Sequence, residues 1–279
     1  MSGFNVPEFL RFLRERESTL GEPFHYFLRS GSTNDDAKQA ARQGALHGSL
    51  FLAEEQTAGR GRQGKSWFGT AGDSLTFSVV VRPKLKSSEL SPLTLAAGLA
   101  VLDAVEELCH AAGRPADHYK LKWPNDLVVQ SSFQKTCEKP IRRKLAGLLL
   151  ETELQNEHAA PAIVIGVGLN VKTTHFPSEL QDIATSLARE GLHCTREELL
   201  ANVLFHLSNW VGKYEKRGST VLADGLTKAD ALIHQRVQVQ VAGQTTVVGA
   251  GAGIREDGAL LVDTGTKIVP VVSGTIVAS

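Results

Sequence analysis

Two segments of the chain repeat apolar residues every three or four positions, which is typical of a helix with one buried face. Residues 91–113 begin with serine and proline and end with glycine, so we predict a helix with Ser91 as its N-cap. Residues 195–218 place Thr195 and Glu198 at capping-box spacing and also end with glycine, so a second helix is predicted there.

Between these helices, four short runs have the apolar and β-branched character of strands. They are residues 118–123, 127–130, 144–154 and 162–171. Parallel neighbours need a crossover of a dozen or more residues, so strands joined by such short links are predicted to be antiparallel. We therefore expect an α+β fold, with a mixed, largely antiparallel sheet and flanking helices. The pattern argues against a doubly wound Rossmann sheet.

The end of the chain changes to short alternating polar and apolar runs separated by turn residues. This pattern predicts a small all-β barrel or sandwich without helices. We expect a domain of residues 1–230 followed by a small domain of residues 231–279. A search for internal repeats of 20 to 50 residues finds none.

Charge and composition limit the functions that this chain can have. The 279 residues include 30 basic and 30 acidic side chains, so no net field would hold the protein on nucleic acid or on an anionic membrane. The N-terminus lacks the pattern of a signal peptide, and no apolar run is long enough to span a bilayer, so a cytoplasmic protein is expected. The three cysteines are far apart and are predicted to be reduced thiols. Residues 131–144 are polar and basic and are predicted to form a solvated loop.

The stretch "GRGRQGKS", residues 59–66, fits the expression of a Walker A phosphate loop. A P-loop requires a helix directly after it, but here glycines and a β-branched run follow, which predict a turn and a strand. The alternative is a glycine-rich loop whose Arg60, Arg62 and Lys65 suit a polyphosphate or an acyl phosphate. Taken by itself, the loop would also fit an exposed turn or an arginine–glycine segment that contacts RNA.

Three further stretches have both a structural and a chemical interpretation. Residues 32–34, "STN", have capping-box spacing from Ser32 to Asp35, but they could also hydrogen-bond a urea-like or amide-like ligand. "KWPND", residues 122–126, reads as a turn between strands. Gly166 and Gly168 alternate in a buried strand, where glycine is costly unless a backbone or a flat ligand must approach closely.

Taken together and in order, "STN", "QTAGRGRQGKSW", "KWPND", "KLAGLLLE" and "IGVGLNV" resemble the biotin protein ligases, also called biotin–[acetyl-CoA-carboxylase] ligases. The resemblance covers residues 30–172, and the tail fits the small SH3-like barrel of that family. It implies ATP-dependent activation of biotin to biotinyl-5′-AMP with release of pyrophosphate. Biotin would then pass to one lysine of a biotin carboxyl carrier domain, as in acetyl-CoA carboxylase. Mg²⁺ is expected with ATP.

The resemblance also implies roles for individual residues. The implied catalytic residues are Lys144, Arg62 and Arg60. The implied biotin-binding residues are Ser32, Thr33, Asn34, Gln56, Arg60, Gly61, Arg62, Lys144, Gly147, Gly166 and Gly168. The implied ATP-binding residues are Gly59, Arg60, Arg62, Trp67, Lys122, Asn125, Asp126, Lys144 and Asn170. Metal ligands are not assigned.

Two departures from the family pattern and two alternatives stand beside this interpretation. Gly31 replaces an aspartate that is frequent in the family, and the loop at 131–143 is longer than usual. About thirty residues precede "STN", too few for the helix-turn-helix domain of some members, so a ligase without repressor function is expected. A lipoate or octanoate ligase or transferase is the nearest alternative, and the pairing of "STN" with "KWPND" favours biotin. A binding-only homologue should lack part of the set Arg60, Arg62 and Lys144.

Overall fold

The structure is a computed structural model that describes residues 3–131, 140–153, 161–241 and 246–278. Most of the predicted polar loop, and Cys137 within it, lie outside the described residues. Cys109 and Cys194 are free thiols. Within the described part of the chain, no helix is long and apolar enough to cross a membrane.

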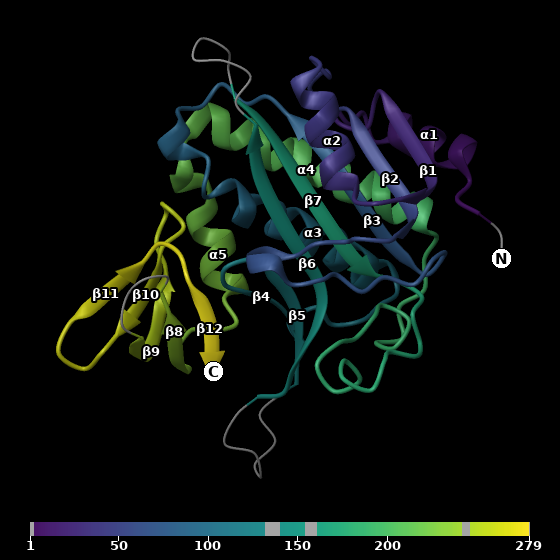
Figure 1. Cartoon of the computed structure of the whole chain (residues 1–279). Helices are drawn as coiled ribbons and strands as arrows, with labels where there is room; N and C mark the ends of the chain where they lie inside the picture. Colours follow the sequence, from purple (N-terminus) through teal and green to yellow (C-terminus); the bar gives the residue numbers. More distant parts are fainter. Residues whose placement is uncertain (1–2, 132–139, 154–160, 242–245, 279) are drawn as a thin grey trace.

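A seven-stranded sheet forms the centre of the molecule (Figure 1). Its strands are β1 (Phe24–Ser30), β2 (Leu50–Gln56), β3 (Ser74–Val81), β4 (Tyr119–Lys122), β5 (Asp126–Gln130), β6 (Arg142–Glu153) and β7 (Ala162–Asn170). They lie in the order β1-β2-β3-β7-β6-β5-β4. β1 and β2 are parallel, and every other neighbouring pair is antiparallel. This confirms the predicted mixed, largely antiparallel sheet.

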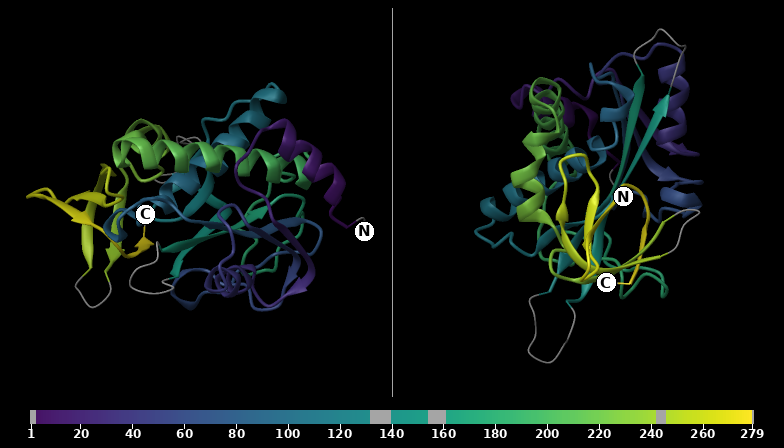
Figure 2. Two further views of the ribbon diagram at one scale, coloured as in Figure 1. Left: turned by 90° about the horizontal axis from the view of Figure 1, so that it is seen from above. Right: turned by 90° about the vertical axis from the view of Figure 1, so that its left-hand side faces the viewer.

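Helices cover the two faces of the sheet unequally (Figure 2). The helices are α1 (Val6–Glu15), α2 (Thr33–Arg42), α3 (Leu93–Ala111), α4 (Arg196–Arg217) and α5 (Ala223–Ala229). Short 3-10 helices η1, η2 and η3 span Arg62–Gly64, Ser87–Glu89 and Ser219–Leu222. One face of the sheet packs against α3 and α4 in the main core. The other face packs against α2 in a smaller apolar cluster, which leaves the rest of that face for a site.

The alternation of side chains along the strands explains this division. In β2, Leu50 and Leu52 belong to the main core, whereas Phe51 between them contacts the cluster under α2. In β7, Ile163 and Ile165 point to the main core, and Val164 points to α2. The same face of β7 continues with Gly166, Gly168 and Asn170.

A second, five-stranded antiparallel sheet follows α5 and lies on the opposite side of the molecule from the N-terminus (Figure 1). Its strands are β8 (Arg236–Gln240), β9 (Val247–Ile254), β10 (Leu260–Asp263), β11 (Ile268–Val271) and β12 (Thr275–Ala278), in the order β11-β10-β9-β8-β12. The prediction of an all-β tail is confirmed. Buried residues of this sheet, such as Val237 and Leu260, belong to the same continuous core as the main sheet.

Two predicted helix caps are wrong in detail. α3 begins at Leu93 with Pro92 in the N-cap position, so Ser91 lies one residue before the cap. Ser32 does occupy the N-cap of α2, but its side chain makes no capping hydrogen bond. Ser32 is buried instead, facing the cavity described below. The cap predicted at Thr195 is confirmed, because its hydroxyl accepts a hydrogen bond from the Glu198 amide.

A buried ion pair fixes the start of α4 against the main sheet. The Arg196 guanidinium donates two hydrogen bonds to the Glu54 carboxylate, over 2.8 and 2.9 Å, and only 3% of Arg196 is exposed. Burial by itself would raise the pKa of Glu54, but hydrogen bonds from Arg196 and Tyr26 outweigh it and hold this pKa below its ordinary value.

Replacing Arg196 by methionine should therefore destabilise the fold strongly. The variant leaves a buried carboxylate without its cation, and we expect a loss of about 3 to 5 kcal/mol in the free energy of unfolding, measured by urea denaturation. A group whose pKa is lowered in the folded state contributes stability above its unfolded pKa and loses it as the pH falls. The difference between wild type and Arg196→Met should accordingly shrink in acid.

Arg255→Met is the matched control, because Arg255 also donates two hydrogen bonds to one carboxylate, that of Asp257, and both of these side chains are about half exposed. Its effect should be much smaller. Equal losses in the two variants would contradict the importance of burial at Arg196.

Candidate functional site

The loop between β2 and β3 is a hairpin and not a phosphate loop leading into an α-helix. The Trp67 amide donates to the Gly59 carbonyl over 2.9 Å, and the Gly61 amide donates to Lys65 over 2.7 Å. The tip is the single 3-10 turn η1, in which Gln63 has a left-handed φ of 56°. The sequence-based rejection of a Walker A motif is confirmed.

This hairpin, which we call the cationic loop (residues 59–67), lies over a cavity of about 450 Å³ on the face of the sheet that α2 leaves open. The predicted site residues that line the cavity come from five separate segments. They are Ser32, Thr33, Asn34, Gln56, Arg60, Gly61, Arg62, Trp67, Lys122, Asn125, Asp126, Lys144, Gly147, Gly166 and Gly168. Gly59 and Asn170 do not line it.

One end of the cavity is a network of neutral hydrogen-bonding groups. The side-chain oxygen of Gln56 accepts hydrogen bonds from the amide and hydroxyl of Thr33, over 2.7 and 3.0 Å. The Ser78 hydroxyl lies 2.5 Å from the Asn34 side-chain oxygen, and the Asn34 amide group donates to Glu151 over 2.8 Å. The network fixes the orientation of short polar side chains that a neutral ligand could address. Ser78 and Glu151 were missed at the sequence level.

The floor of the cavity is made by glycines. A Cβ atom at Gly166 would stand 2.0 Å from the Asn34 side-chain oxygen, and one at Gly168 would stand 2.2 Å from the Trp67 ring. Gly147 is similarly crowded by Lys144 and Trp67. The Trp67 indole N–H is buried and has no hydrogen-bond partner among the described residues, so a ligand acceptor there would satisfy it.

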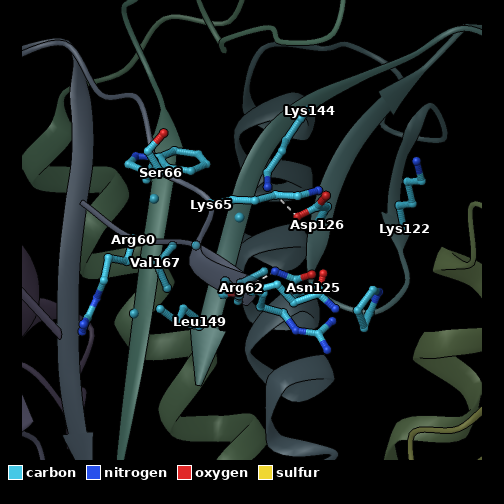
Figure 3. A pocket seen from close by; sticks show the side chains of 18 of the residues that line it. Arg60, Arg62, Lys65, Ser66, Lys122, Asn125, Asp126, Lys144, Leu149 and Val167 are labelled. Atoms are coloured by element: carbon cyan, nitrogen blue, oxygen red, sulfur yellow. Dashed lines mark hydrogen bonds and ion pairs between the residues drawn. The ribbon is translucent and has the colours of Figure 1, made fainter. Parts of the chain in front are cut away.

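The opposite end of the cavity is strongly cationic (Figure 3). The lining of the whole cavity contains six basic side chains and one carboxylate: Arg60, Arg62, Lys65, Lys122, Arg142, Lys144 and Asp126. Lys144 Nζ lies 2.6 Å from Asp126 Oδ1 and 5.4 Å from the centre of a Trp67 ring. Burial lowers the pKa of Lys122, Asp126 acts in the opposite direction, and the neighbouring cations lower it further. This surplus of positive charge favours a bound anion.

Arg60 points away from this cationic end in the structure (Figure 3). Its guanidinium is paired with Asp35 on α2 and lies 3.6 Å from the Glu151 carboxylate. Arg62 has no ion pair with a described residue, and burial lowers its pKa. The two arginines of the loop, which the sequence treats alike, therefore have different surroundings.

Asn170 is buried and supports the cavity indirectly, through a second residue. Its side-chain amide donates to the Thr185 carbonyl over 2.9 Å, and the Thr185 amide in turn donates to the Lys144 carbonyl over 2.9 Å. Asn170 thus holds the segment that fixes the backbone of Lys144. Gly59 lies at the base of the cationic loop, where a Cβ would stand 2.9 Å from the Gln56 amide nitrogen.

Several residues that do line the cavity were also missed at the sequence level. Arg142 lies two residues before Lys144 in β6, so the period-2 rule for strands could have placed both on one face. Gly274, Thr275 and Ile276 reach the cavity from the second sheet, and no local signal in the sequence indicates this.

The described residues contain no group of three or more His, Cys, Asp or Glu side chains that could hold a metal ion. In the cavity, the Asp126 carboxylate and the Asn125 amide oxygen are the oxygen donors that suit Mg²⁺. These two oxygens leave most of the ligands of a magnesium ion to be supplied by another group.

The cavity has the features of a small-molecule binding site, with a neutral recognition end and an anion-binding end. Residues 26–170 match the sequence profile of the Biotin/lipoate A/B protein ligase family, and residues 232–278 match that of the Biotin protein ligase C terminal domain. The chain therefore belongs to the biotin protein ligases of this family. The resemblance found in the motifs is confirmed.

Individual relatives agree with this assignment. The biotin–[acetyl-CoA-carboxylase] ligase of Mycobacterium tuberculosis is 36% identical over 89% of this chain and 86% of its own length. The bifunctional ligase/repressor BirA of Escherichia coli is 30% identical over 98% of this chain and 80% of its own length. The structure of the Aquifex aeolicus biotin protein ligase in complex with biotin and ATP has a TM-score of 0.73 and 27% identity, covering 91% of this chain and 97% of that one.

The close approach of Gly168 to Trp67 can be tested directly. Because the ring is rigid, Gly168→Ala must displace it, and we expect a red shift of tryptophan fluorescence with a loss of about 1 to 3 kcal/mol in stability. Gly212→Ala in α4 is the control, since nothing lies within 4 Å of the added carbon. The shift should be absent when Trp67 is first replaced by phenylalanine, and a shift that persists in that background would contradict the assignment.

Proposed function

We propose that this protein is an ATP-dependent biotin protein ligase. It activates biotin to biotinyl-5′-AMP with release of pyrophosphate and then transfers biotin to a lysine of a biotin carboxyl carrier domain, such as that of acetyl-CoA carboxylase. One observation carries the proposal: a single cavity joins the neutral network around Asn34 and Gln56 to the cationic end around Lys144. Biotin has a urea-like head and a carboxylate tail, and ATP supplies the anion.

The geometry suits a reaction between two anions. The biotin carboxylate attacks the α-phosphate of ATP, so no side-chain nucleophile is needed, but two negative groups must be brought together. Lys144 and Arg62 offset this repulsion and stabilise the charge that grows on the phosphoryl oxygens. In the second step, the acceptor lysine attacks the mixed anhydride and AMP leaves.

We assign the remaining residues from their positions. Ser32, Thr33, Asn34 and Gln56 would bind the biotin head, with Gly166 and Gly168 below it and Gly147 nearby. Trp67, Lys122, Asn125 and Asp126 would line the nucleotide region, and Gly61 would let the loop approach the reactants. Arg60 must leave Asp35 to reach the anion. Gly59 would support the base of the loop, and Asn170 would support Lys144 through Thr185.

Magnesium would enter with ATP. The phosphates supply most of its oxygen ligands, and Asp126 and Asn125 offer protein oxygens beside them. When bound, Mg²⁺ reduces the negative charge that faces the biotin carboxylate. Asp126 is paired with Lys144 in this structure, so binding MgATP would separate that pair.

The chain would use two domains, residues 1–230 for catalysis and residues 231–279 as the small SH3-like domain. Use of ATP and of a carrier protein supports a cytoplasmic location. The nearest alternative substrate is lipoate, because the first profile covers biotin and lipoate ligases together. The C-terminal match, which is to biotin protein ligases, favours biotin.

The function is tested by incubating the purified protein with ATP, Mg²⁺ and a carrier domain, with biotin or lipoate as the acid. We expect modification of the carrier lysine with biotin and release of pyrophosphate. A carrier variant whose acceptor lysine is arginine is the control and should stay unmodified. Transfer of lipoate in preference to biotin would overturn the proposal.

Lys144→Ala should impair formation of the adenylate more than binding of biotin. Loss of one well-placed donor to a developing oxyanion costs about 3 to 4 kcal/mol, or 10²- to 10³-fold in rate. Single-turnover pyrophosphate release measures the rate, and calorimetry measures the biotin affinity. Arg143 is exposed and lies outside the cavity, so Arg143→Ala removes the same charge and serves as the control. It should change neither the rate of adenylate formation nor the biotin affinity. An unchanged adenylation rate in Lys144→Ala would remove this residue from the mechanism.

A further inference from the structure

The second sheet takes part in the walls of the reaction cavity. Gly274, Thr275 and Ile276, at the start of β12, line it together with the cationic loop. β12 is hydrogen-bonded to β8 within its own sheet, with Thr275 opposite Gln240. A strand of the small domain thus stands directly beside the loop that covers the reactants.

One hydrogen bond connects this strand to the tip of the loop. The Thr275 hydroxyl donates to the side-chain oxygen of Gln63 over 2.6 Å. Within the part of the chain that the structure describes, this is the one side-chain hydrogen bond that ties residues 61–66 to the rest of the protein. Arg60 holds the loop on the α2 side through Asp35.

The tip residue adopts a backbone conformation that needs support. Gln63 has a φ of 56°, and side-chain-bearing residues occupy this left-handed region only at some cost. Gly64 follows with a φ of 74°, so two successive residues at the tip are left-handed. A contact that holds the Gln63 side chain in place favours this conformation of the loop over others.

The sheet to which this strand belongs is itself anchored to the main sheet. The Trp123 indole N–H donates to the Gly258 carbonyl over 2.9 Å, and Arg142 donates to the Ala231 carbonyl over 2.8 Å. The Ala231 amide donates to Leu121 in β4 over 2.9 Å. These bonds fix the second sheet to the same β4–β5–β6 edge of the main sheet that carries Lys122 and Lys144.

We propose that the Thr275–Gln63 hydrogen bond is a latch by which the C-terminal domain holds the cationic loop over the activated intermediate. The inference rests on the proposed function. A mixed anhydride that leaves the cavity is hydrolysed or acylates other amines, so retention depends on the time that the loop stays closed. Gln63 and Thr275 are positioning residues: they act through the loop, and Arg62 and Lys144 make the contacts with the reactants.

The test compares escape of the intermediate with its formation in the full-length protein. Biotinyl-5′-AMP is formed on the enzyme without carrier, and its escape is followed after a chase with excess unlabelled biotin. Thr275→Val removes the donor at nearly constant shape, and we expect escape to rise about 2- to 10-fold, the range for loss of one neutral hydrogen bond. The rate of adenylate formation should change by less. Thr275→Ser keeps the hydroxyl and should restore retention.

Thr246→Val is the matched control, because the Thr246 hydroxyl donates to the Gln240 side-chain oxygen over 2.8 Å in the same sheet and makes no hydrogen bond to a described residue of the loop. Gln63→Met removes the acceptor, and in combination with Thr275→Val it should add little to either single change. Escape at the wild-type rate in Thr275→Val, an equal rise in Thr246→Val, or additive effects in the double variant would each overturn the latch.

A second measurement separates failure of the latch from failure of the proposed function. Trypsin can cut the loop after Arg60, Arg62 and Lys65, so the rate of cutting without any ligand reports how well the tip is held. Thr275→Val should be cut about 2- to 10-fold faster than wild type or Thr246→Val. Equal cutting rates contradict the latch, whereas a wild-type protein that forms no adenylate but shows the difference contradicts the ligase assignment alone.

Discussion

The cavity depends on one steric constraint: on the face of β7 that the loop covers, Gly166 and Gly168 present no side chains. On this face, Ala162 and Val164 pack under α2, and Gly166 and Gly168 then leave the strand bare. Asn34 and Trp67 enter the space so closely that a single methyl group at either glycine would collide with them. β7 thus packs against α2 at one end and forms the floor of the cavity at the other. The change from packing to floor occurs between Val164 and Gly166.

Charge shapes the site as strongly as space does. Several cations surround Asp126. Burial lowers the pKa of Lys122, and the neighbouring cations lower it further because like charges disfavour one another's charged forms. The fold tolerates this repulsion because the neighbouring strands are fixed by their core side and by the ladder of backbone hydrogen bonds. An incoming polyphosphate would relieve it, so part of the affinity for the anion is built into the unliganded protein.

The sequence predicts most of the fold because each signal is local. The period-2 runs mark β4 to β7, and their short links exclude crossovers, so pairing and direction follow. The failures are also local: proline displaced the cap of α3 by one residue, and Ser32 faces the cavity where a cap was expected.

The site was predicted through motifs, which identify residues but not partners. The pairing of Arg60 with Asp35, the support of Lys144 by Asn170 through Thr185, and the contribution of Arg142 all depend on how segments meet in space.

The contact between Gln63 and Thr275 joins positions 212 residues apart and lies beyond any reading of local pattern. This contact is possible only because the apolar core of the small sheet is continuous with that of the large sheet. β12 is therefore held in a fixed position relative to the cavity. Trp123 contributes to both sides of this arrangement: its indole holds the second sheet, while Asn125 and Asp126, two and three residues later, face the cavity. The segment that the sequence presents as a turn between strands therefore also aligns the two sheets. Any change that loosens this alignment should act on the loop before it acts on the reacting groups.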